Sequence, residues 1–144
     1  MKYSGHKNQK RIKMGKQINI GTLISGGGTN LQAIIDACAA NQIDAAIKFT
    51  GSDNPGVKGL ERAETAGIDT FVVDYTQIIR SCRENGIRDA ALPDDFDMSE
   101  VAKKQQLTTA DMSDDKVEFF LKTRAIAEKQ LLDHIRKYEI DLLV

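Results

Sequence analysis

The sequence INIGTLISGGGTNLQAII, residues 18–35, constrains the fold more than any other part of the chain. An apolar run is followed by three consecutive glycines, and an apolar pattern of helical period begins directly after them. This order predicts a strand, a tight loop and a helix. Because glycine has no Cβ atom and adopts positive φ readily, Gly26, Gly27 and Gly28 allow a sharp turn and a close approach to a ligand.

The helix after the glycines is expected to begin at Thr29. Thr29 and Gln32 have the T-x-x-Q spacing of a capping box, in which the two residues exchange side-chain to backbone hydrogen bonds. Free N–H groups and the positive end of the helix dipole would then face a guest over Gly28, Thr29 and Asn30. A phosphate or carboxylate is the expected guest, although a plain structural turn between strand and helix would give the same pattern.

Composition is that of one soluble globular domain. The chain has 144 residues, 41% of them hydrophobic, and a formal net charge of −1. This balance gives no sign of nucleic-acid or membrane binding, and no stretch is apolar enough to span a bilayer, so a cytoplasmic location is expected. Residues 1–16 are locally basic and are expected to form a disordered tail. The oligomeric state is left open.

Strand and helix patterns alternate over residues 17–144. Strands are expected at 17–24, 45–50, 70–74 and 140–144, and helices at 29–40, after Asn54-Pro55, at 76–85 and at 114–138. Right-handed crossovers then give a doubly wound, mainly parallel sheet in a three-layer α/β/α, Rossmann-like fold. The order 3-2-1-4 would place the glycine loop beside the switch point, where ligands collect.

The second helix has start and stop signals of its own. Asn54 is expected to cap it and Pro55 to occupy its first turn, since proline suits that position. Val57, Leu60 and Ala63 are expected to face the core, and Gly67 to end the helix.

Residues 86–113 interrupt the alternation. They contain Pro93 and an acidic cluster between Asp94 and Glu100, but no sustained apolar period. We expect an inserted excursion that is mainly a solvated spacer, with one helical turn near residues 99–104.

The last expected strand, residues 140–144, is apolar almost throughout. Such a run is typical of the middle of a parallel sheet, which needs a following element and covering helices. We therefore expect the fold to be truncated after this strand and the chain to be the first part of a longer polypeptide.

Arg124 and Glu128 fall on the apolar stripe of the last helix, and a charged pair there needs an explanation. One explanation is an ion pair at the edge of the packed face, with the methylenes of Arg124 lying on apolar surface. The other is that the helix begins at the carboxyl ends of the strands, so that Arg124 overhangs the cleft and meets an anionic ligand. The pattern alone leaves both open.

Other chemically capable side chains have no partners at catalytic or metal-ligand spacing. Cys38 and Cys82 are expected to be reduced thiols, and His134 to be a solvated side chain late in its helix. Ser25 is expected to support the loop by hydrogen bonding, because the G-x-S-x-G pattern of a nucleophile is not satisfied. We predict no metal site.

Three segments resemble the phosphoribosylglycinamide formyltransferases, also called glycinamide ribonucleotide transformylases, of purine biosynthesis. They are LISGGGTNLQAII at 23–35, GLERAETAGI at 59–68, and the segment from Thr123-Arg124 through Tyr138 to DLLV at 141–144. The resemblance covers most of residues 17–144 except 86–113. Related formyltetrahydrofolate enzymes share the fold, but the S-G-x-G-[ST]-N-L-Q pattern is typical of this branch.

The resemblance implies that 10-formyltetrahydrofolate gives its formyl group to the amine of 5-phosphoribosylglycinamide, without a metal. It implies that Gly28, Thr29 and Asn30 hold the substrate's phosphate and that Arg124 contacts the folate. The family's catalytic asparagine, histidine and aspartate lie beyond the strand where this chain ends. We therefore expect no catalytic residue in this chain and no turnover by the 144 residues alone.

Two other classes remain open. The first is a dinucleotide-binding Rossmann module, for which Asp53 stands at a tolerable distance for a ribose contact but Leu31 replaces the third glycine of G-x-G-x-x-G. The second is a noncatalytic binding domain.

Overall fold

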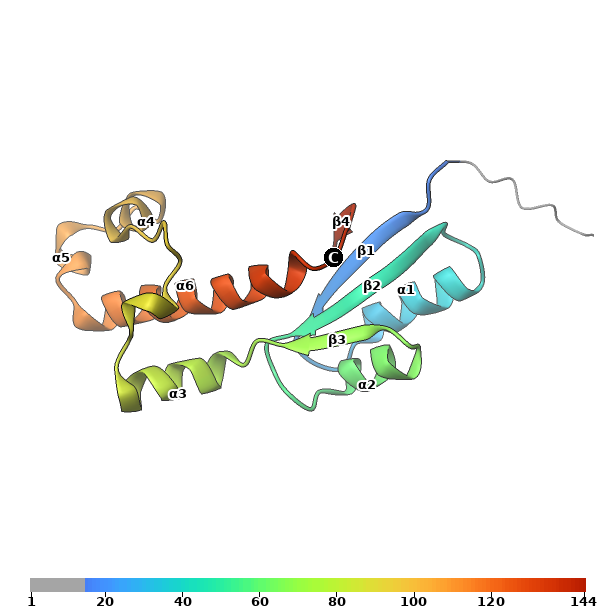
Figure 1. The fold of residues 1–144 in the computed structure, drawn as a ribbon, viewed down its shortest axis with the longest axis horizontal. Helices are drawn as coiled ribbons and strands as arrows, with labels where there is room; N and C mark the ends of the chain where they lie inside the picture. Colours follow the sequence, from blue (N-terminus) through green and yellow to red (C-terminus); the bar gives the residue numbers. More distant parts are fainter. Residues whose placement is uncertain (1–14) are drawn as a thin grey trace, which may run out of the picture.

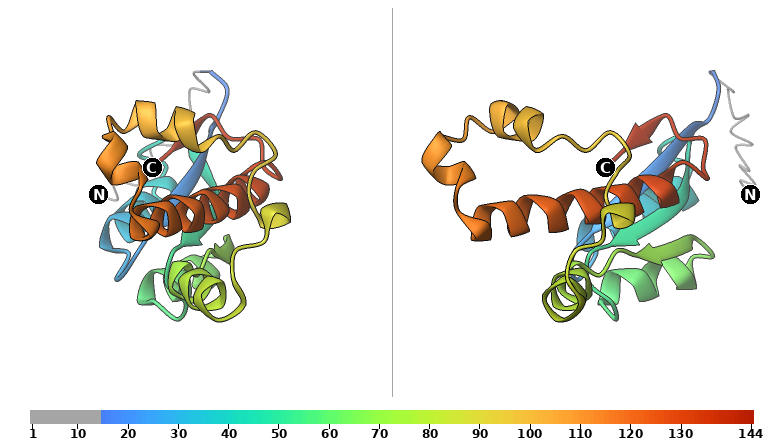
Figure 2. Two further views of the ribbon diagram at one scale, coloured as in Figure 1. Left: turned by 90° about the vertical axis from the view of Figure 1, so that its left-hand side faces the viewer. Right: turned by 60° about the vertical axis from the view of Figure 1, so that its left-hand side comes forward.

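The computed structural model describes residues 15–144, so nearly all of the predicted tail lies outside the described residues. Within that range four parallel strands form one sheet in the order β3-β2-β1-β4. Their bounds are β1 Ile18–Ile24, β2 Ala45–Ser52, β3 Asp69–Val72 and β4 Leu142–Leu143. Helices α1 and α2 cover one face, and α6 crosses the other (Figures 1 and 2). The predicted α/β/α fold and the strand order are confirmed.

The core lies between the sheet and α6. Phe49 on β2 is fully buried, and its ring contacts those of Phe71 and Tyr138 at centroid distances of 5.3 and 4.9 Å. A Cβ atom at Gly21 would lie 2.3 Å from the Phe49 ring, so β1 must carry a glycine opposite this phenylalanine. The buried cluster consists of Phe49, Phe71, Val73, Ile78, Leu92, Ala125 and Ile126.

Helices α1 (Thr29–Ala39) and α2 (Lys58–Thr65) follow the first two strands. The prediction that Asn54-Pro55 begins α2 is wrong, because the helix starts three residues after Pro55 with Val57 at its N-cap. The Ser52 hydroxyl instead donates to the Asn54 carbonyl at 2.8 Å and accepts from its N–H at 3.1 Å, which holds this segment as a turn. Gly67, at φ 72°, follows the helix as predicted.

Helices α3 (Tyr75–Asn85) and α6 (Asp115–Ile135) pack against each other. Residue Asp74 caps α3 by accepting the Gln77 N–H at 2.9 Å. Helix α6 extends well beyond the sheet, and the segment between α3 and α6 returns along its projecting half (Figure 1). None of the helices among residues 15–144 is long and apolar enough to cross a membrane.

The excursion at 86–113 contains η1 (Asp89–Ala91), α4 (Met98–Lys104) and α5 (Thr109–Met112). The prediction of a helical turn near 99–104 corresponds to α4. The prediction of a mainly solvated spacer is wrong at Leu92 and Ala102, which are both 8% exposed. Leu92 joins the core cluster and α4 contacts α6, so this segment covers the part of α6 that the sheet does not reach.

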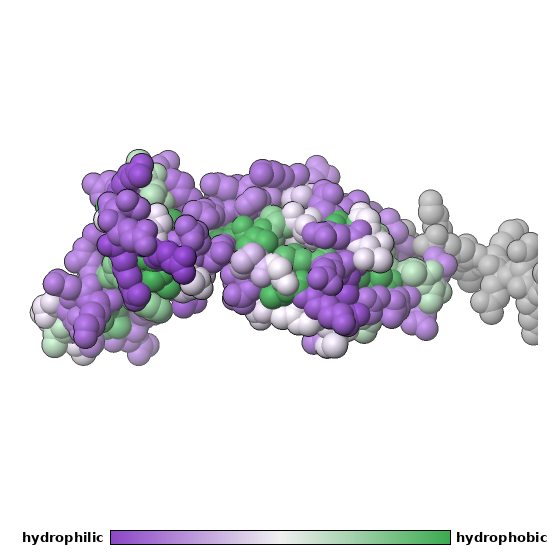
Figure 3. All heavy atoms as spheres, turned by 90° about the horizontal axis from the view of Figure 1, so that it is seen from below, coloured by the Kyte–Doolittle hydropathy of each residue, from purple (hydrophilic) through white to green (hydrophobic). Residues whose placement is uncertain are grey.

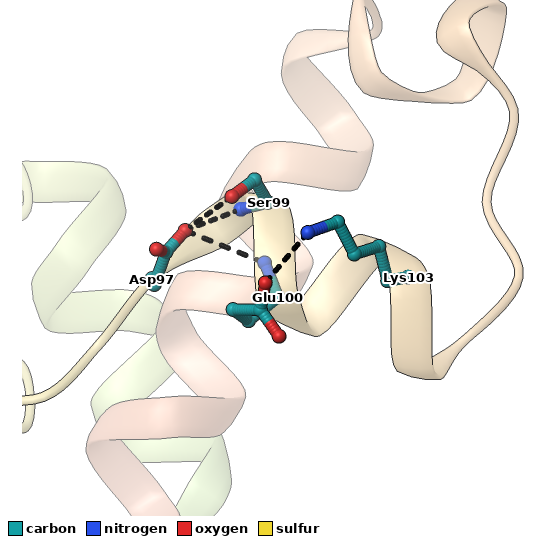
Figure 4. Close-up of polar contacts among 4 residues, drawn as sticks. All are labelled: Asp97, Ser99, Glu100 and Lys103. Atoms are coloured by element: carbon teal, nitrogen blue, oxygen red, sulfur yellow. Dashed lines mark hydrogen bonds and ion pairs between the residues drawn. The ribbon is translucent and has the colours of Figure 1, made fainter.

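Short polar contacts fix the ends of these small helices. The Asp97 carboxylate accepts the N–H groups of Ser99 and Glu100 at 2.8 and 3.3 Å, and the Ser99 hydroxyl at 2.7 Å (Figure 4). These hydrogen bonds hold the pKa of Asp97 below its usual value, and the bond from the Ser99 hydroxyl contributes most. A full capping box forms at Thr108 and Asp111.

The Asp97 cap predicts an acid-dependent loss of α4. Its pKa is lower in the folded chain than the unfolded value of about 3.9, so its stabilisation is present above about pH 4 and is lost as the pH falls through the folded pKa. Asp97→Asn keeps an acceptor for the two N–H groups but cannot titrate. We expect the α4 amide signals of the wild type to broaden or shift below pH 4, and those of Asp97→Asn to depend less on pH. Identical NMR titrations would contradict this.

Strand β4 is shorter than the five residues predicted and lies at an edge of the sheet within residues 15–144. Leu142 and Leu143 are 49% and 46% exposed. They pair with Ile20 and Gly21 of β1, so the apolar run sits in the predicted place beside β1 but is not covered by the described residues.

Candidate functional site

The glycine loop ends in a residue with a left-handed backbone conformation. Gly28 has φ 68° and is the N-cap of α1, with no side-chain capping bond. The prediction of a Thr29–Gln32 capping box is therefore wrong. The side chain of Gln32 is used elsewhere, because its amide donates to Asp36 at 2.9 Å and its carbonyl accepts from Arg62 at 3.1 Å.

Two glycines allow the loop to touch α2. A Cβ atom at Gly28 would lie 2.6 Å from the Cα atom of Gly59, and one at Gly59 would lie 2.3 Å from Ile24 Cδ1 and 2.9 Å from the Gly26 carbonyl oxygen. Real Cβ atoms essentially never approach so closely. Gly59 begins the GLERAETAGI segment, so the two sequence motifs meet at this contact.

Three successive carbonyls of the loop are hydrogen-bonded from the α2 side. Asn54 Nδ2 donates to the Ser25 carbonyl at 3.3 Å, the Gly59 N–H to the Gly26 carbonyl at 3.0 Å, and Arg62 Nε to the Gly27 carbonyl at 2.9 Å. Ser25 thus supports the loop through its backbone oxygen. Sequence reasoning missed Asn54, Gly59 and Arg62 as loop residues, because nothing in their spacing shows that the end of β2 and the start of α2 lie against the glycines.

A cleft of about 630 Å³ opens at the carboxyl ends of β1, β2 and β3. Its walls are mainly apolar and aromatic, and α6 forms the side opposite the strands. This is the position where open α/β sheets bind ligands. Seen from below Figure 1, hydrophobic residues are visible in the middle of the molecule and also on its left-hand lobe, among largely hydrophilic surroundings (Figure 3). The lining includes Ser25, Asp53, Phe71, Tyr75, Phe120, Arg124, Glu128 and Leu131.

Arg124 stands on the rim of this cleft. Its Nε lies 3.5 Å from Glu128 Oε1, and its guanidinium carbon lies 6.0 Å from the centre of the Phe120 ring. The side chain is 58% exposed, so the ion pair is a surface pair with little energetic weight. Arg124 also lines a smaller cavity of about 250 Å³ beside α4. The edge ion pair and the cleft position, the two explanations left open by the sequence, are both present in the structure.

The structure brings some of the expected site residues together and separates others. Ser25, Asp53 and Arg124 line one cleft. Gly28, Thr29 and Asn30 are not among its lining residues, although they follow Ser25 in the chain. The two expected binding functions, for an anion and for a larger cofactor, would therefore occupy neighbouring parts of one edge of the sheet.

His134 differs from the expected solvated side chain. Its ring stacks on Phe71 with centroids 4.4 Å apart and planes 2° apart. Cys38 and Cys82 are free and half-buried, and burial raises the pKa of the Cys38 thiol. Within residues 15–144 no three His, Cys, Asp or Glu side chains are grouped to hold a metal ion.

Comparison with known proteins gives partial but consistent matches. The phosphoribosylglycinamide formyltransferase of Escherichia coli (strain K12) is 50% identical over 56 residues, which are 39% of this chain and 26% of that protein. The enzyme of the same name from Dictyostelium discoideum is 43% identical over 70 residues, 49% of this chain and 34% of that protein. The chain therefore spans about a third or less of the length of these curated relatives.

Solved structures give the same kind of match. Glycinamide ribonucleotide transformylase 1 from Symbiobacterium toebii is 34% identical, with a TM-score of 0.40, over 65% of this chain and 38% of that one. The family model described as formyl transferase matches residues 18–144, which include the glycine loop, the Gly59 segment and α6. The chain belongs to the formyl transferase family.

Proposed function

We propose that this chain carries the phosphate-binding part of a phosphoribosylglycinamide formyltransferase of purine biosynthesis. In this reaction the amine nitrogen of 5-phosphoribosylglycinamide forms a bond to the formyl carbon and loses a proton, while the bond from that carbon to the folate nitrogen breaks and this nitrogen gains a proton. The observation that carries the proposal is the glycine loop at the end of β1 in a chain of the formyl transferase family. The carbonyls of this loop accept hydrogen bonds from the side of α2.

The loop suits a phosphate for electrostatic reasons. The N–H groups of Thr29 and Asn30 lie in the first turn of α1, where a helix supplies no intrahelical acceptors. The positive end of the helix dipole adds to them. Gly28, Thr29 and Asn30 are therefore the proposed substrate-binding residues.

The cleft suits a folate-derived formyl donor in its shape and composition. Its volume of about 630 Å³ lies within the usual range for ligand sites, roughly 300–1,000 Å³. Phe71, Tyr75 and Phe120 provide apolar and aromatic walls for a flat ring system, and Arg124 provides a cation at the rim. 10-Formyltetrahydrofolate would supply the formyl group there, and Arg124 is the proposed contact to it.

We further propose that the groups that move the proton are not among these 144 residues. A transfer to an amine needs a positioned acid or base, typically worth 10²–10⁴-fold. His134, the histidine within the described range, stacks face to face on Phe71. We therefore expect this chain to bind substrate without turning it over.

Calorimetric titration of the 144-residue chain tests the proposal. We expect weak binding of 5-phosphoribosylglycinamide and no heat from NAD, because Leu31 is buried at the position where a dinucleotide site needs a glycine. Formyl transfer should not exceed that of buffer and boiled controls. Binding of NAD alone would favour the dinucleotide-binding module instead, and measurable turnover would show that the catalytic groups are present.

Removing the charge of Arg124 should weaken folate binding and spare phosphate binding. Arg136→Gln is a matched control, because Arg136 is the C-cap residue of α6, pairs with Asp133 at 3.9 Å and does not line the cleft. We expect Arg124→Gln to raise the Kd for a tetrahydrofolate analogue about tenfold, the factor for losing one charged contact. Fluorescence titration measures this. If both substitutions raised this Kd equally, Arg124 would have no role in folate binding beyond its surface ion pair.

A further inference from the structure

We propose that Arg62 is a positioning residue for the glycine loop: it holds the Gly27–Gly28 peptide so that its N–H points toward the bound anion. This inference rests on the proposed phosphate site and adds a residue of α2 to it. Arg62 need not contact the ligand for this role, since it acts on the backbone that does.

The contacts of Arg62 join three parts of the fold. Its Nε donates to the Gly27 carbonyl at 2.9 Å and one terminal nitrogen donates to Gln32 Oε1 at 3.1 Å. Gln32 in turn donates to Asp36 at 2.9 Å on α1. The guanidinium therefore fixes the loop relative to both helices. Arg62 is half-buried, its bond to Gln32 is partly buried and its bond to the Gly27 carbonyl is exposed.

The planarity of the peptide bond gives these contacts their consequence. In a trans peptide the carbonyl of one residue and the N–H of the next point in opposite directions, and no peptide bond among residues 15–144 is cis. Because the carbonyls of Ser25, Gly26 and Gly27 accept hydrogen bonds from the α2 side, the N–H groups of Gly26, Gly27 and Gly28 point away from α2. Three donors are thus turned to one side of the loop.

Arginine suits this task better than lysine. Its rigid planar fork supplies two N–H groups in fixed directions, one to the loop and one to Gln32, whereas a lysine ammonium is a point charge on a flexible chain. The loop needs such a restraint, because a Cβ atom at Gly26 or Gly27 would meet nothing within 4 Å and glycine has the least intrinsic preference for one conformation. Without Arg62 the Gly27–Gly28 peptide could turn its carbonyl toward the anion.

The experiment compares Arg62→Lys with Arg80→Lys in the 144-residue chain. Arg80 is an exposed residue of α3, so its replacement controls for the loss of a guanidinium. Inorganic phosphate and ribose 5-phosphate are titrated while the amide signals of residues 26–30 are followed by NMR. We expect Arg62→Lys to bind both ligands about tenfold more weakly, because the Gly27–Gly28 peptide is no longer held with its N–H toward the anion, and Arg80→Lys to bind them as the wild type does.

A second variant guards against misfolding. Gln32→Met keeps the helical side chain but removes the acceptor for Arg62, so we expect a smaller loss of phosphate affinity in the same direction. Equal affinities of wild type, Arg62→Lys and Gln32→Met would overturn the role of Arg62 and leave the phosphate site standing. No shift of residues 26–30 in the wild type would overturn the phosphate site itself, and the role of Arg62 with it.

Discussion

Gly28→Ala is expected to abolish phosphate binding and to destabilise the chain. At φ 68° an alanine adopts a strained conformation that costs about 1–3 kcal/mol. Its Cβ atom would also lie 2.6 Å from Gly59 Cα, a backbone atom that cannot rotate away, and such overpacking typically costs about 1–3 kcal/mol. The start of α1 must move away from α2 to relieve this contact, which displaces the donors of Thr29 and Asn30.

Gly26→Ala provides a matched control within the same loop. Its new Cβ atom would meet nothing within 4 Å, and Gly26 is not among the positive-φ residues of the described chain. We expect nearly wild-type stability and phosphate affinity, measured by urea unfolding and NMR titration. Equal losses in the two variants would mean that the loop needs small residues throughout, rather than one left-handed glycine against Gly59.

Phe49→Ala is expected to have the largest effect on stability. The Phe49 side chain is fully buried between Phe71, Tyr138 and Gly21, and removal of a buried phenylalanine ring costs about 3–5 kcal/mol. Domains are stable by only about 5–15 kcal/mol, so much of the chain would be unfolded or close to it. Urea unfolding followed by circular dichroism measures the change.

Phe120→Ala is the corresponding control, because Phe120 is 48% exposed on the cleft side of α6. Its replacement should change the free energy of unfolding by no more than about 0.5 kcal/mol. The same substitution should weaken the binding of a folate analogue, since it removes part of the cleft wall. A Phe49→Ala variant as stable as Phe120→Ala would show that the packing around β2 contributes little.

The strand order and the positions of α1, α3 and α6 could be predicted because they follow local rules. Apolar periodicity and the handedness of parallel crossovers determine the order of the strands and which residues face the sheet, and Gly67 marks a helix end by its own chemistry. The glycine loop was predictable for the same reason. The family resemblance was also contained in contiguous segments. The formyl transferase match over residues 18–144 and the similarity to phosphoribosylglycinamide formyltransferases confirm it.

The errors have a common physical origin in contacts between distant segments. Gln32 has the spacing of a capping residue, but Arg62, thirty residues later, competes for its side chain. Asn54 has a capping sequence, but Ser52 and the loop take up its groups. The burial of Leu92 depends on α6, which follows it in the chain. Local patterns cannot reveal such competition. The residues that hold the loop were therefore not predicted, although the loop itself was.

The projecting half of α6 links the length of that helix to the presence of the excursion. Leu121 and Ala125 are buried in this half, and residues of the excursion cover them: Leu92 and Phe96 pack with the cluster that includes Ala125, and Val101 lines the cavity beside Leu121. A formyl transferase that lost residues 86–113 would leave two apolar positions facing water. Such a relative should therefore have a shorter helix here, or polar residues at these two positions, so that insertion and helix are gained or lost together in evolution.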